Sequence, residues 1–260
     1  MNQNRLDQIE KILRVQKQAS VLELASLLKV SDMTIRRDLN VLESQGKVNR
    51  YFGGASISPE FFQKDDLPAY HPDQCVEEKR RIGKCGRDYL RSIILNSTAA
   101  SISLLSGTTV LEMVNAIDFT IPASIITDNL KTTQVLAQNA HNNIIMLGGK
   151  ISLPSLNLVG YFAERTLESL TIDYTFTGMA GIDYDGNLYC YEEQHASVLR
   201  RLLRNSNHII VLADHSKIGF NSMVRITQMD DSYNLLTDPG ADKACLQNYR
   251  KMGIEVMLCE

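Results

Sequence analysis

Hydrophobic side chains near the start of the chain recur with a helical period in three successive segments. These segments are residues 5–17, 21–28 and 32–44. Ser20 and Glu23 open the second segment with the spacing of a capping box, and Ser31 stands at the N-cap position of the third. Only residues 29–30 separate these two helices, and Gly46 stands where a glycine commonly ends a helix. The pattern predicts a helix-turn-helix.

A short basic strand follows, at residues 47–51, and glycines close it. Helix, short helix, tight turn, helix and β-wing together predict a winged helix-turn-helix domain over residues 1–58. In that geometry the third helix lies in the major groove of DNA, and its outward face contacts bases and phosphates. The residues expected at the DNA are Ser31, Met33, Thr34, Arg36, Arg37, Lys47 and Arg50.

One alternative for the Arg36–Arg37 pair remains open. The two arginines could form ion pairs with Asp32 and Asp38 on a solvated helix face, without any role in binding. The capped helix pair before them and the basic strand after them favour DNA contact.

The rest of the chain alternates between helical and strand patterns. Residues 59–76 contain three prolines and no period, so we expect a linker there. Over residues 77–260, strands are separated by helical patterns of roughly 10–15 residues, which predicts a mostly parallel sheet covered on both faces. The predicted strands are 101–105, 124–126, 144–147, 174–177, 209–213, 235–236 and 254–258. The predicted helices are 77–94, 110–117, 129–140, 162–170, 192–204 and 243–251. The fold class is α/β.

Charge and composition narrow the class of protein. Of the 260 residues 44% are hydrophobic and 22% charged, which is typical of a globular protein. Residues 1–58 carry a net charge of +3 and the remainder −6, as expected when one end meets a polyanion. The chain has no apolar run of about 18 residues and no apolar leader, so we expect a cytoplasmic protein without a membrane partner. Five scattered cysteines without a CxxC pair indicate no metal site, no disulfide framework and no cofactor.

Small and polar residues follow the predicted strands where the next helices begin. Ligands of parallel sheets bind at this carboxyl edge. Residues 106–109 combine a glycine, hydroxyl groups and the free N–H groups of a helix start, which suits a phosphate. One such loop is also an ordinary capping turn, but five at successive strand ends favour a pocket for a phosphorylated polyol. Its expected contacts are Ser106, Gly107, Thr108, Thr109, Thr127, Asn129, Gly148, Gly149, Gly178, Gly181 and Asp183.

Several of these segments resemble the DeoR family of bacterial transcriptional regulators. Residues 30–39 are similar to the recognition helix of that family, and residues 78–82, 106–109, 147–149, 178–183 and 214–217 are similar to segments of its sensor domain. The resemblance extends from about residue 5 to about residue 240. It implies a homodimer or homotetramer that represses a sugar-use operon and leaves DNA when a phosphorylated sugar binds. It also implies a sensor fold like that of ribose-phosphate isomerases and CoA-transferases, and a phosphate or hydroxyl contact for Lys217.

Three positions depart from the family pattern. The family usually has an aspartate directly before the SGTT-like loop, where this chain has Leu105. On the helix before strand 209–213 it usually has a glutamate and, four residues later, a lysine, where this chain has His195 and Leu199. These charges are the ones expected to orient hydroxyl groups of an effector, so we expect a phosphorylated ligand of unusual identity or an altered response. For His195 the alternative is a packing residue without a ligand.

The sequence therefore predicts a sequence-specific DNA-binding repressor of a sugar or sugar-alcohol catabolic operon, with residues 77–260 as its effector-sensing domain. Its expected partners are a double-stranded DNA operator and a small phosphorylated sugar. One alternative is a ligand-independent DNA-binding protein with a degenerate sensor domain. Another is a sugar-phosphate isomerase, but that reaction needs a base near the substrate carbon. Because the candidate charges at positions 105, 195 and 199 are missing, we do not expect an enzyme.

Overall fold

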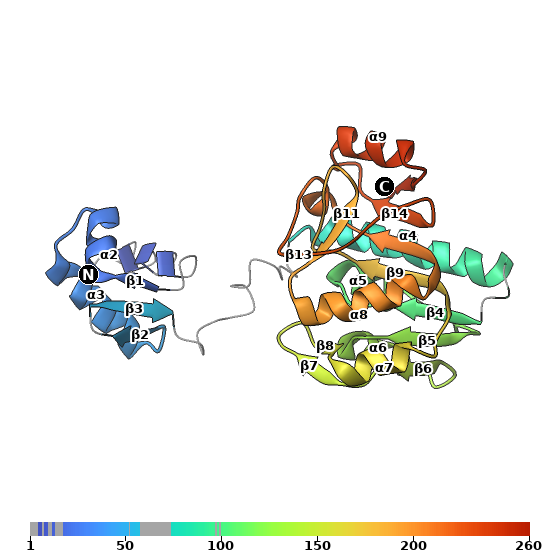
Figure 1. Ribbon diagram of the computed structural model, residues 1–260, viewed down its shortest axis with the longest axis horizontal. Coiled ribbons are helices and arrows are strands. Elements are labelled where there is room, and N and C mark those ends of the chain that lie inside the picture. Colours follow the sequence, from blue (N-terminus) through green and yellow to red (C-terminus); the bar gives the residue numbers. More distant parts are fainter. Residues whose placement is uncertain are drawn as a thin grey trace. The chain divides into compact units, whose positions relative to one another are not determined.

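The computed structural model describes residues 5, 6, 8, 9, 12, 13, 18–51, 53–57, 74–96, 98 and 100–260. The chain divides into two compact units, Met1–His71 and Pro72–Glu260 (Figure 1). Each unit is described by itself. Most of the predicted linker at 59–76 lies outside the described residues, and a helix already begins at Val76.

The first unit is a helix-turn-helix packed against a small sheet. Helices α2 (Val21–Leu28) and α3 (Asp32–Ser44) match the prediction, and the described positions of segment 5–17 between residues 5 and 13 are helical. The capping box forms, because the Ser20 backbone N–H donates to the Glu23 carboxylate at 2.7 Å. The core consists of buried apolar side chains from all three helices, among them Leu6, Ile9, Leu13, Leu24, Ile35, Leu39 and Leu42.

The sheet of this unit is antiparallel with the strand order β1-β3-β2. Strand β2 (Val48–Tyr51) is the predicted basic strand, and it forms a hairpin with β3 (Gly54–Ile57). Gly53, in the turn between them, has φ +87°, a conformation that favours glycine. Strands β3 and β1 (Gln18–Ser20) were not predicted. Three or four residues are too few for a strand period to show in a sequence.

The second unit contains a seven-stranded sheet in which every neighbouring pair is parallel. Its order is β15-β14-β12-β9-β4-β5-β6. The strands are β4 (Ser101–Leu104), β5 (Ser124–Thr127), β6 (Asn143–Met146), β9 (Ile172–Gly178), β12 (Ser206–Leu212), β14 (Tyr233–Thr237) and β15 (Glu255–Leu258). The predicted parallel α/β architecture is confirmed.

Helices cover both faces of this sheet (Figure 1). Helices α4 (Val76–Asn96), α5 (Thr108–Asn115) and α6 (Leu130–Leu136) share one hydrophobic cluster, and α7 (Tyr161–Leu167), α8 (Glu193–Arg204) and α9 (Lys243–Lys251) share the other. Alternate side chains of a strand point to opposite faces of the sheet and pack in the two different clusters. In β12, Ile210 and Leu212 belong to the first cluster and Ile209 and Val211 to the second. This arrangement explains the near-continuous apolar runs in the strands.

Two small antiparallel elements were not predicted. A hairpin joins β7 (Lys150–Ser152) to β8 (Asn157–Val159). A three-stranded sheet has the order β10-β11-β13 and consists of Gly181–Ile182, Asn187–Cys190 and Val224–Gln228. No strand was predicted in these segments, because two to five residues carry no recognisable strand period.

The strand order reverses next to β4. From β4 the chain builds β5 and β6 on one side, then returns to place β9 on the other side. Open parallel sheets bind ligands at such a switch point, at the carboxyl ends of the strands. The loops after β4, β5 and β9 therefore surround the place where a ligand is expected. Among the described residues, no helix is both long and apolar enough to cross a membrane.

Candidate DNA-binding and effector sites

The exposed face of α3 carries two unpaired arginines. Arg36 and Arg37 are exposed, and neither has a hydrogen bond or ion pair within the described part of the chain. Asp38 is buried, and its carboxylate accepts hydrogen bonds from the Arg5 guanidinium at 2.6 and 3.2 Å. The alternative in which Asp38 neutralises these arginines is therefore wrong. Both guanidinium groups are available to a polyanion.

The other predicted DNA contacts differ in whether their side chains are exposed or hydrogen-bonded within the protein. Ser31 caps α3 and shares a hydrogen bond with the Thr34 hydroxyl at 2.9 Å, while Met33 is 70% exposed. On the wing, Lys47 is half-buried and Arg50 donates a hydrogen bond to the Asn40 side chain of α3. Arg50 thus holds the wing strand against α3. A contact between these side chains and DNA stays a prediction.

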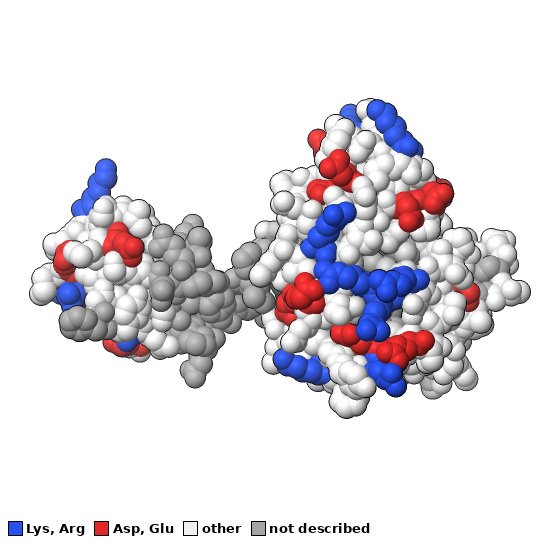
Figure 2. Space-filling view, in the orientation of Figure 1, with Lys and Arg blue, Asp and Glu red and all other residues white. Residues whose placement is uncertain are grey.

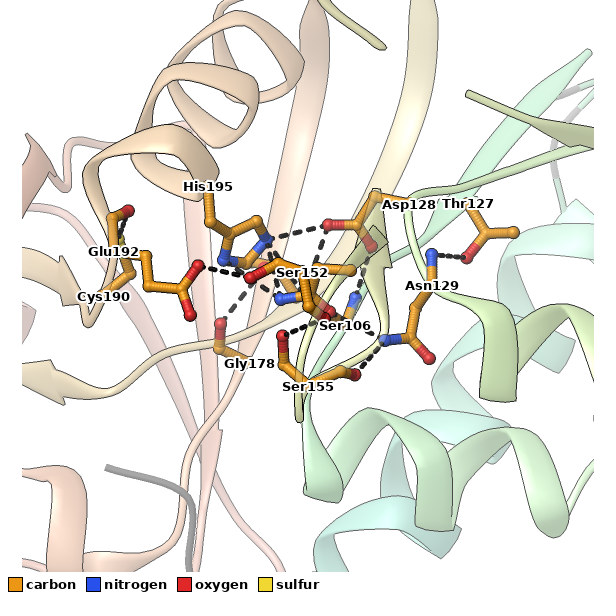
Figure 3. Close-up of polar contacts among 12 residues, drawn as sticks. Ser106, Thr127, Asp128, Asn129, Ser152, Ser155, Gly178, Cys190, Glu192 and His195 are labelled. Atoms are coloured by element: carbon orange, nitrogen blue, oxygen red, sulfur yellow. Dashed lines mark hydrogen bonds and ion pairs between the residues drawn. The ribbon is translucent and has the colours of Figure 1, made fainter. Parts of the chain in front are cut away.

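In the second unit, three polar side chains meet at the switch point (Figure 3). They come from the end of β4, the end of β5 and the first turn of α8. The Asp128 carboxylate is fully buried and accepts hydrogen bonds from the Ser106 backbone N–H at 2.8 Å and the Ser106 hydroxyl at 3.3 Å. His195, whose side chain is 12% exposed, places Nε2 2.9 Å from the same carboxylate. We call these three residues the switch-point cluster.

This cluster contains a serine, a histidine and an aspartate, but it is not a catalytic triad. In a triad the serine and the aspartate contact opposite nitrogens of the imidazole, so that the ring can pass on a proton. Here the Ser106 hydroxyl lies 3.2 Å from Nε2 of His195, and Asp128 contacts the same Nε2. The arrangement is therefore suited to hydrogen bonding with a ligand rather than to nucleophilic attack.

The β7–β8 hairpin is fastened to this cluster. Asn129 at the end of β5 caps α6 and donates to Asn157 of β8 at 2.7 Å, and Asn157 lies 3.3 Å from Nδ1 of His195. On its other strand, the hydroxyl of Ser152 donates to Glu192, next to α8, at 2.6 Å (Figure 3). The hairpin thus contributes polar groups to the site from both of its strands.

The loop after β4 supplies a backbone cradle. Gly107 has φ +138°, and a Cβ atom added there would lie 3.0 Å from the Cα of Gly178 at the end of β9. Close approach of the two strand ends therefore requires glycine. No side chain caps the start of α5, so the N–H groups of its first turn, including Thr108 and Thr109, point outward from the helix start. Such a helix start attracts anions.

The remaining predicted effector residues have other neighbours. Gly149 lies against β8, since an added Cβ would meet the Val159 carbonyl oxygen at 2.7 Å, and Gly148 has open space around it. Thr127 accepts a hydrogen bond from the Asn129 N–H. Gly181 packs against the Phe220 carbonyl, and Lys217 lies on a short 3₁₀ helix, η3 (His215–Lys217).

Asp183 is engaged within its own hairpin. Its carboxylate accepts hydrogen bonds from Asn187 and from the Tyr189 hydroxyl at 2.8 Å. Burial raises the pKa of Asp183, but these hydrogen bonds outweigh burial, so the pKa lies below its ordinary value. The structure gives no contact between Asp183, Gly181 or Lys217 and the switch-point cluster. Their roles in effector binding stay predictions.

Two residues of the site were missed or misjudged from sequence. Asp128 stands between the predicted Thr127 and Asn129 but was not selected, although its place after a strand was a usable signal. The ring of His195 is hydrogen-bonded within the protein, to Asp128 and Ser106, and a contact between it and a ligand stays a prediction. Nothing in the sequence identified Asn157, which the β7–β8 hairpin brings to the site.

The two leucines at positions where the family pattern has charges lie in the same kind of surroundings. Leu105 and Leu199 are 0% and 1% exposed and belong to one hydrophobic cluster. An aspartate or a lysine alone in such surroundings would be an uncompensated buried charge. The joint change to leucine removes both charges and leaves an apolar wall beside the switch-point cluster.

Basic side chains are also prominent over α8 in the second unit (Figure 2). Two of them are ion-paired: Arg200 with Glu193 of the same helix at 2.6 Å, and Arg201 with Glu164 of α7 at 3.2 Å and Glu168 at 3.7 Å. The Arg201 ion pairs join α8 to α7.

Comparison with known proteins gives a family match in each of the two units. Residues 5–60 match the family described as DeoR-like helix-turn-helix domain, and residues 74–239 match the DeoR C terminal sensor domain. The chain is 28% identical to the HTH-type transcriptional repressor CsqR of Escherichia coli K12, over 98% of this chain and 94% of that protein. It is 29% identical to the glycerol-3-phosphate regulon repressor of Haemophilus influenzae, over 88% of this chain and 87% of that protein.

Among solved structures, ribose 5 phosphate isomerase A of Neisseria gonorrhoeae aligns with 60% of this chain and 54% of its own, at 13% identity and a TM-score of 0.37. That similarity is too low to support an argument about function. The two family matches together span most of the sequence. The chain belongs to the DeoR family of transcriptional regulators.

Proposed function

We propose that this protein is a transcriptional repressor that binds operator DNA through residues 1–58 and a small phosphorylated sugar through residues 77–260, with residues 59–76 as the linker. The observation that supports binding of a phosphorylated sugar is the uncapped start of α5 beside the switch-point cluster. The names of relatives that repress a glycerol-3-phosphate regulon support the same class of ligand. We place its action in the cytoplasm, with the operator.

The phosphate group is assigned to the loop after β4. The N–H groups at the start of α5 and the hydroxyl of Thr108 can donate to phosphate oxygens, and the helix dipole favours negative charge there. Gly107 and Gly178 allow a ligand to come close to the backbone.

The polyol part is assigned to the switch-point cluster and Asn157. Asp128 can accept hydrogen bonds from ligand hydroxyls, and His195 and Asn157 can donate or accept them. Leu105 and Leu199 are buried in the core at the two positions where the family pattern has charges. We expect a ligand that does not need two charged partners there.

The proposal that residues 1–58 bind operator DNA rests on the unpaired arginines of α3. An isolated helix-turn-helix contacts one half-site, so we propose a homodimer or homotetramer that binds a pseudo-palindromic operator with half-sites about one helical turn, or a multiple of it, apart. Relief of repression requires that the effector bind the DNA-incompetent arrangement more tightly than the competent one.

Fluorescence anisotropy with the DNA upstream of the protein's own gene tests this proposal. The titration is run at fixed salt, with and without a panel of sugar phosphates and the matching unphosphorylated sugars. We expect tight binding that one phosphorylated compound weakens and its unphosphorylated counterpart does not. Relief by the unphosphorylated sugar alone contradicts the phosphate assignment, and equal binding to an operator with one half-site scrambled contradicts the symmetric assembly.

A second candidate is a DNA-binding protein whose sensor domain no longer responds to a ligand. The replacement of family charges by Leu105, His195 and Leu199 favours it. Thermal unfolding distinguishes the two candidates, since a ligand at 100 times its dissociation constant stabilises a protein by about 2.7 kcal/mol. No shift with any compound of the panel supports the degenerate sensor.

A further inference from the structure

A second histidine of this unit lies between a thiol and a carboxylate. Cys75 directly precedes α4, His215 lies on η3 after β12, and Asp238 follows β14. The Sγ atom of Cys75 is 3.9 Å from Nε2 of His215, and Nδ1 of His215 is 3.0 Å from Oδ2 of Asp238. In contrast to the switch-point cluster, the two partners contact opposite nitrogens of the ring.

The carboxylate holds this ring in one orientation. Asp238 is buried, and besides His215 Nδ1 it accepts hydrogen bonds from the His215 backbone N–H at 2.7 Å and the Gly240 N–H at 2.9 Å. An ionised carboxylate can only accept, so Nδ1 carries the proton and Nε2 presents a lone pair to the thiol. This is the tautomer that a general base for Cys75 requires.

The thiol itself depends on such a base. Burial raises the pKa of the Cys75 thiol. The Asp214 carboxylate raises it further through its charge and a hydrogen bond, and the charge of Glu78 adds to the increase, whereas a hydrogen bond with Ser216 lowers it. The thiol is therefore protonated near neutral pH and is a weak nucleophile by itself. Its position is accessible, because Cys75 is half-buried and the His215 side chain is 39% exposed.

The surrounding charges select the electrophile. Asp214 and Glu78 lie near the thiol, and Asp238 lies behind the imidazole. Anionic reagents such as carboxylates or phosphates are repelled by this group of acidic residues, whereas uncharged reagents are not. The first N–H groups of α4 lie next to Cys75. The Cys75 carbonyl accepts the first hydrogen bond of that helix, from the Lys79 N–H.

We propose that Cys75 is a base-assisted nucleophile and a site of covalent modification by small uncharged electrophiles. With an alkylating reagent, the sulfur bonds to the electrophilic carbon, the leaving group departs with its electron pair, and Nε2 of His215 takes the thiol proton. The site does not include the switch-point cluster, but Lys217, a predicted effector contact, lies on the same short helix as His215.

Alkylation of the full-length protein by iodoacetamide, followed at the level of individual peptides by mass spectrometry, tests the proposal. We expect Cys75 to react in the folded protein, and His215→Ala to slow this reaction by about 10²-fold, the lower end of what a positioned base contributes. Free imidazole should restore part of the rate in the variant. Cys85, half-buried on the same helix, is the internal control and should react equally in both proteins.

The charge argument gives an independent test in the unaltered protein. The ratio of iodoacetamide to iodoacetate reactivity should be at least about tenfold higher at Cys75 than for 2-mercaptoethanol, since acidic residues repel the anion. If His215→Ala does not fold, as judged by circular dichroism, His215→Gln takes its place. Unchanged Cys75 reactivity in a folded His215 variant overturns the proposal, as does a Cys75 that stays unreactive in the native protein.

Discussion

The buried carboxylate of Asp128 offers a quantitative test of the site. Asp128→Ala removes the acceptor of three donors at once, the Ser106 backbone N–H at 2.8 Å, the Ser106 hydroxyl at 3.3 Å and the His195 ring at 2.9 Å. Each buried donor left without a partner costs about 1–3 kcal/mol. The Ser106 hydroxyl retains His195 and His195 retains Asn157 as a neighbour, so only the Ser106 N–H loses its partner outright. We therefore expect a loss of about 1–3 kcal/mol in the free energy of unfolding.

Urea unfolding followed by circular dichroism measures this loss, because the chain has no tryptophan for fluorescence. Asp128→Asn keeps an acceptor for the Ser106 N–H and should lose about 1 kcal/mol. Asp118→Ala is the matched control, since its carboxylate is exposed and pairs only with Arg91 at the surface; it should change stability by less than about 0.5 kcal/mol. If Asp128→Ala behaves like Asp118→Ala, the hydrogen-bonded core of the site has been misread.

Three further predictions concern the DNA contacts, the apolar wall and the acid stability. Arg37→Ala should weaken operator binding by about 1–3 kcal/mol and relax base preference, whereas Lys47→Ala should weaken all sequences alike and lower the salt slope by about one unit. Anisotropy titrations at several salt concentrations would show equal, small effects if the groove assignment is wrong. Leu105→Asp should destabilise the protein, because it buries an uncompensated charge. Adding Leu199→Lys should recover part of this loss. If the effects of the two changes on urea unfolding are strictly additive, the two positions do not share a site. The folded-state pKa of Asp183 is lowered, so the stabilisation by its carboxylate is present above the ordinary pKa of 3.8 and is lost as the pH falls below that value. Asp183→Asn should therefore lose less stability than the parent protein in that pH range. If stability falls in parallel for both proteins in acid titrations, this prediction is wrong.

The sequence was most informative where a structural signal is local. The capping box at Ser20, the N-cap at Ser31 and the helical stripes of α2 and α3 involve residues within one or two turns of each other. The apolar runs of the seven parallel strands are local in the same sense, and they correctly predicted the α/β architecture. Short antiparallel strands such as β7 and β10 were missed, since two or three residues carry no recognisable period.

The candidate site was only partly predictable. Glycine and hydroxyl residues after β4 marked the loop proposed to bind phosphate, because glycine at φ +138° and an uncapped helix start depend on a few consecutive residues. The sequence could not show that His195 meets Asp128, 67 positions earlier. It also indicated a charge loss at three positions without showing that Leu105 and Leu199 pack in one cluster.

The main helices, the parallel strands and their order could be read from the sequence, because hydrophobic period, capping and glycine placement act over a few residues. Which polar groups share a site depends on contacts between distant segments, and these come from the folded chain. The strand order places β9 beside β4 and β12 beside β14, and so joins residues that are far apart along the chain. His215 lies 140 positions from Cys75 and 23 from Asp238, and the fold brings these two partners to opposite nitrogens of its ring.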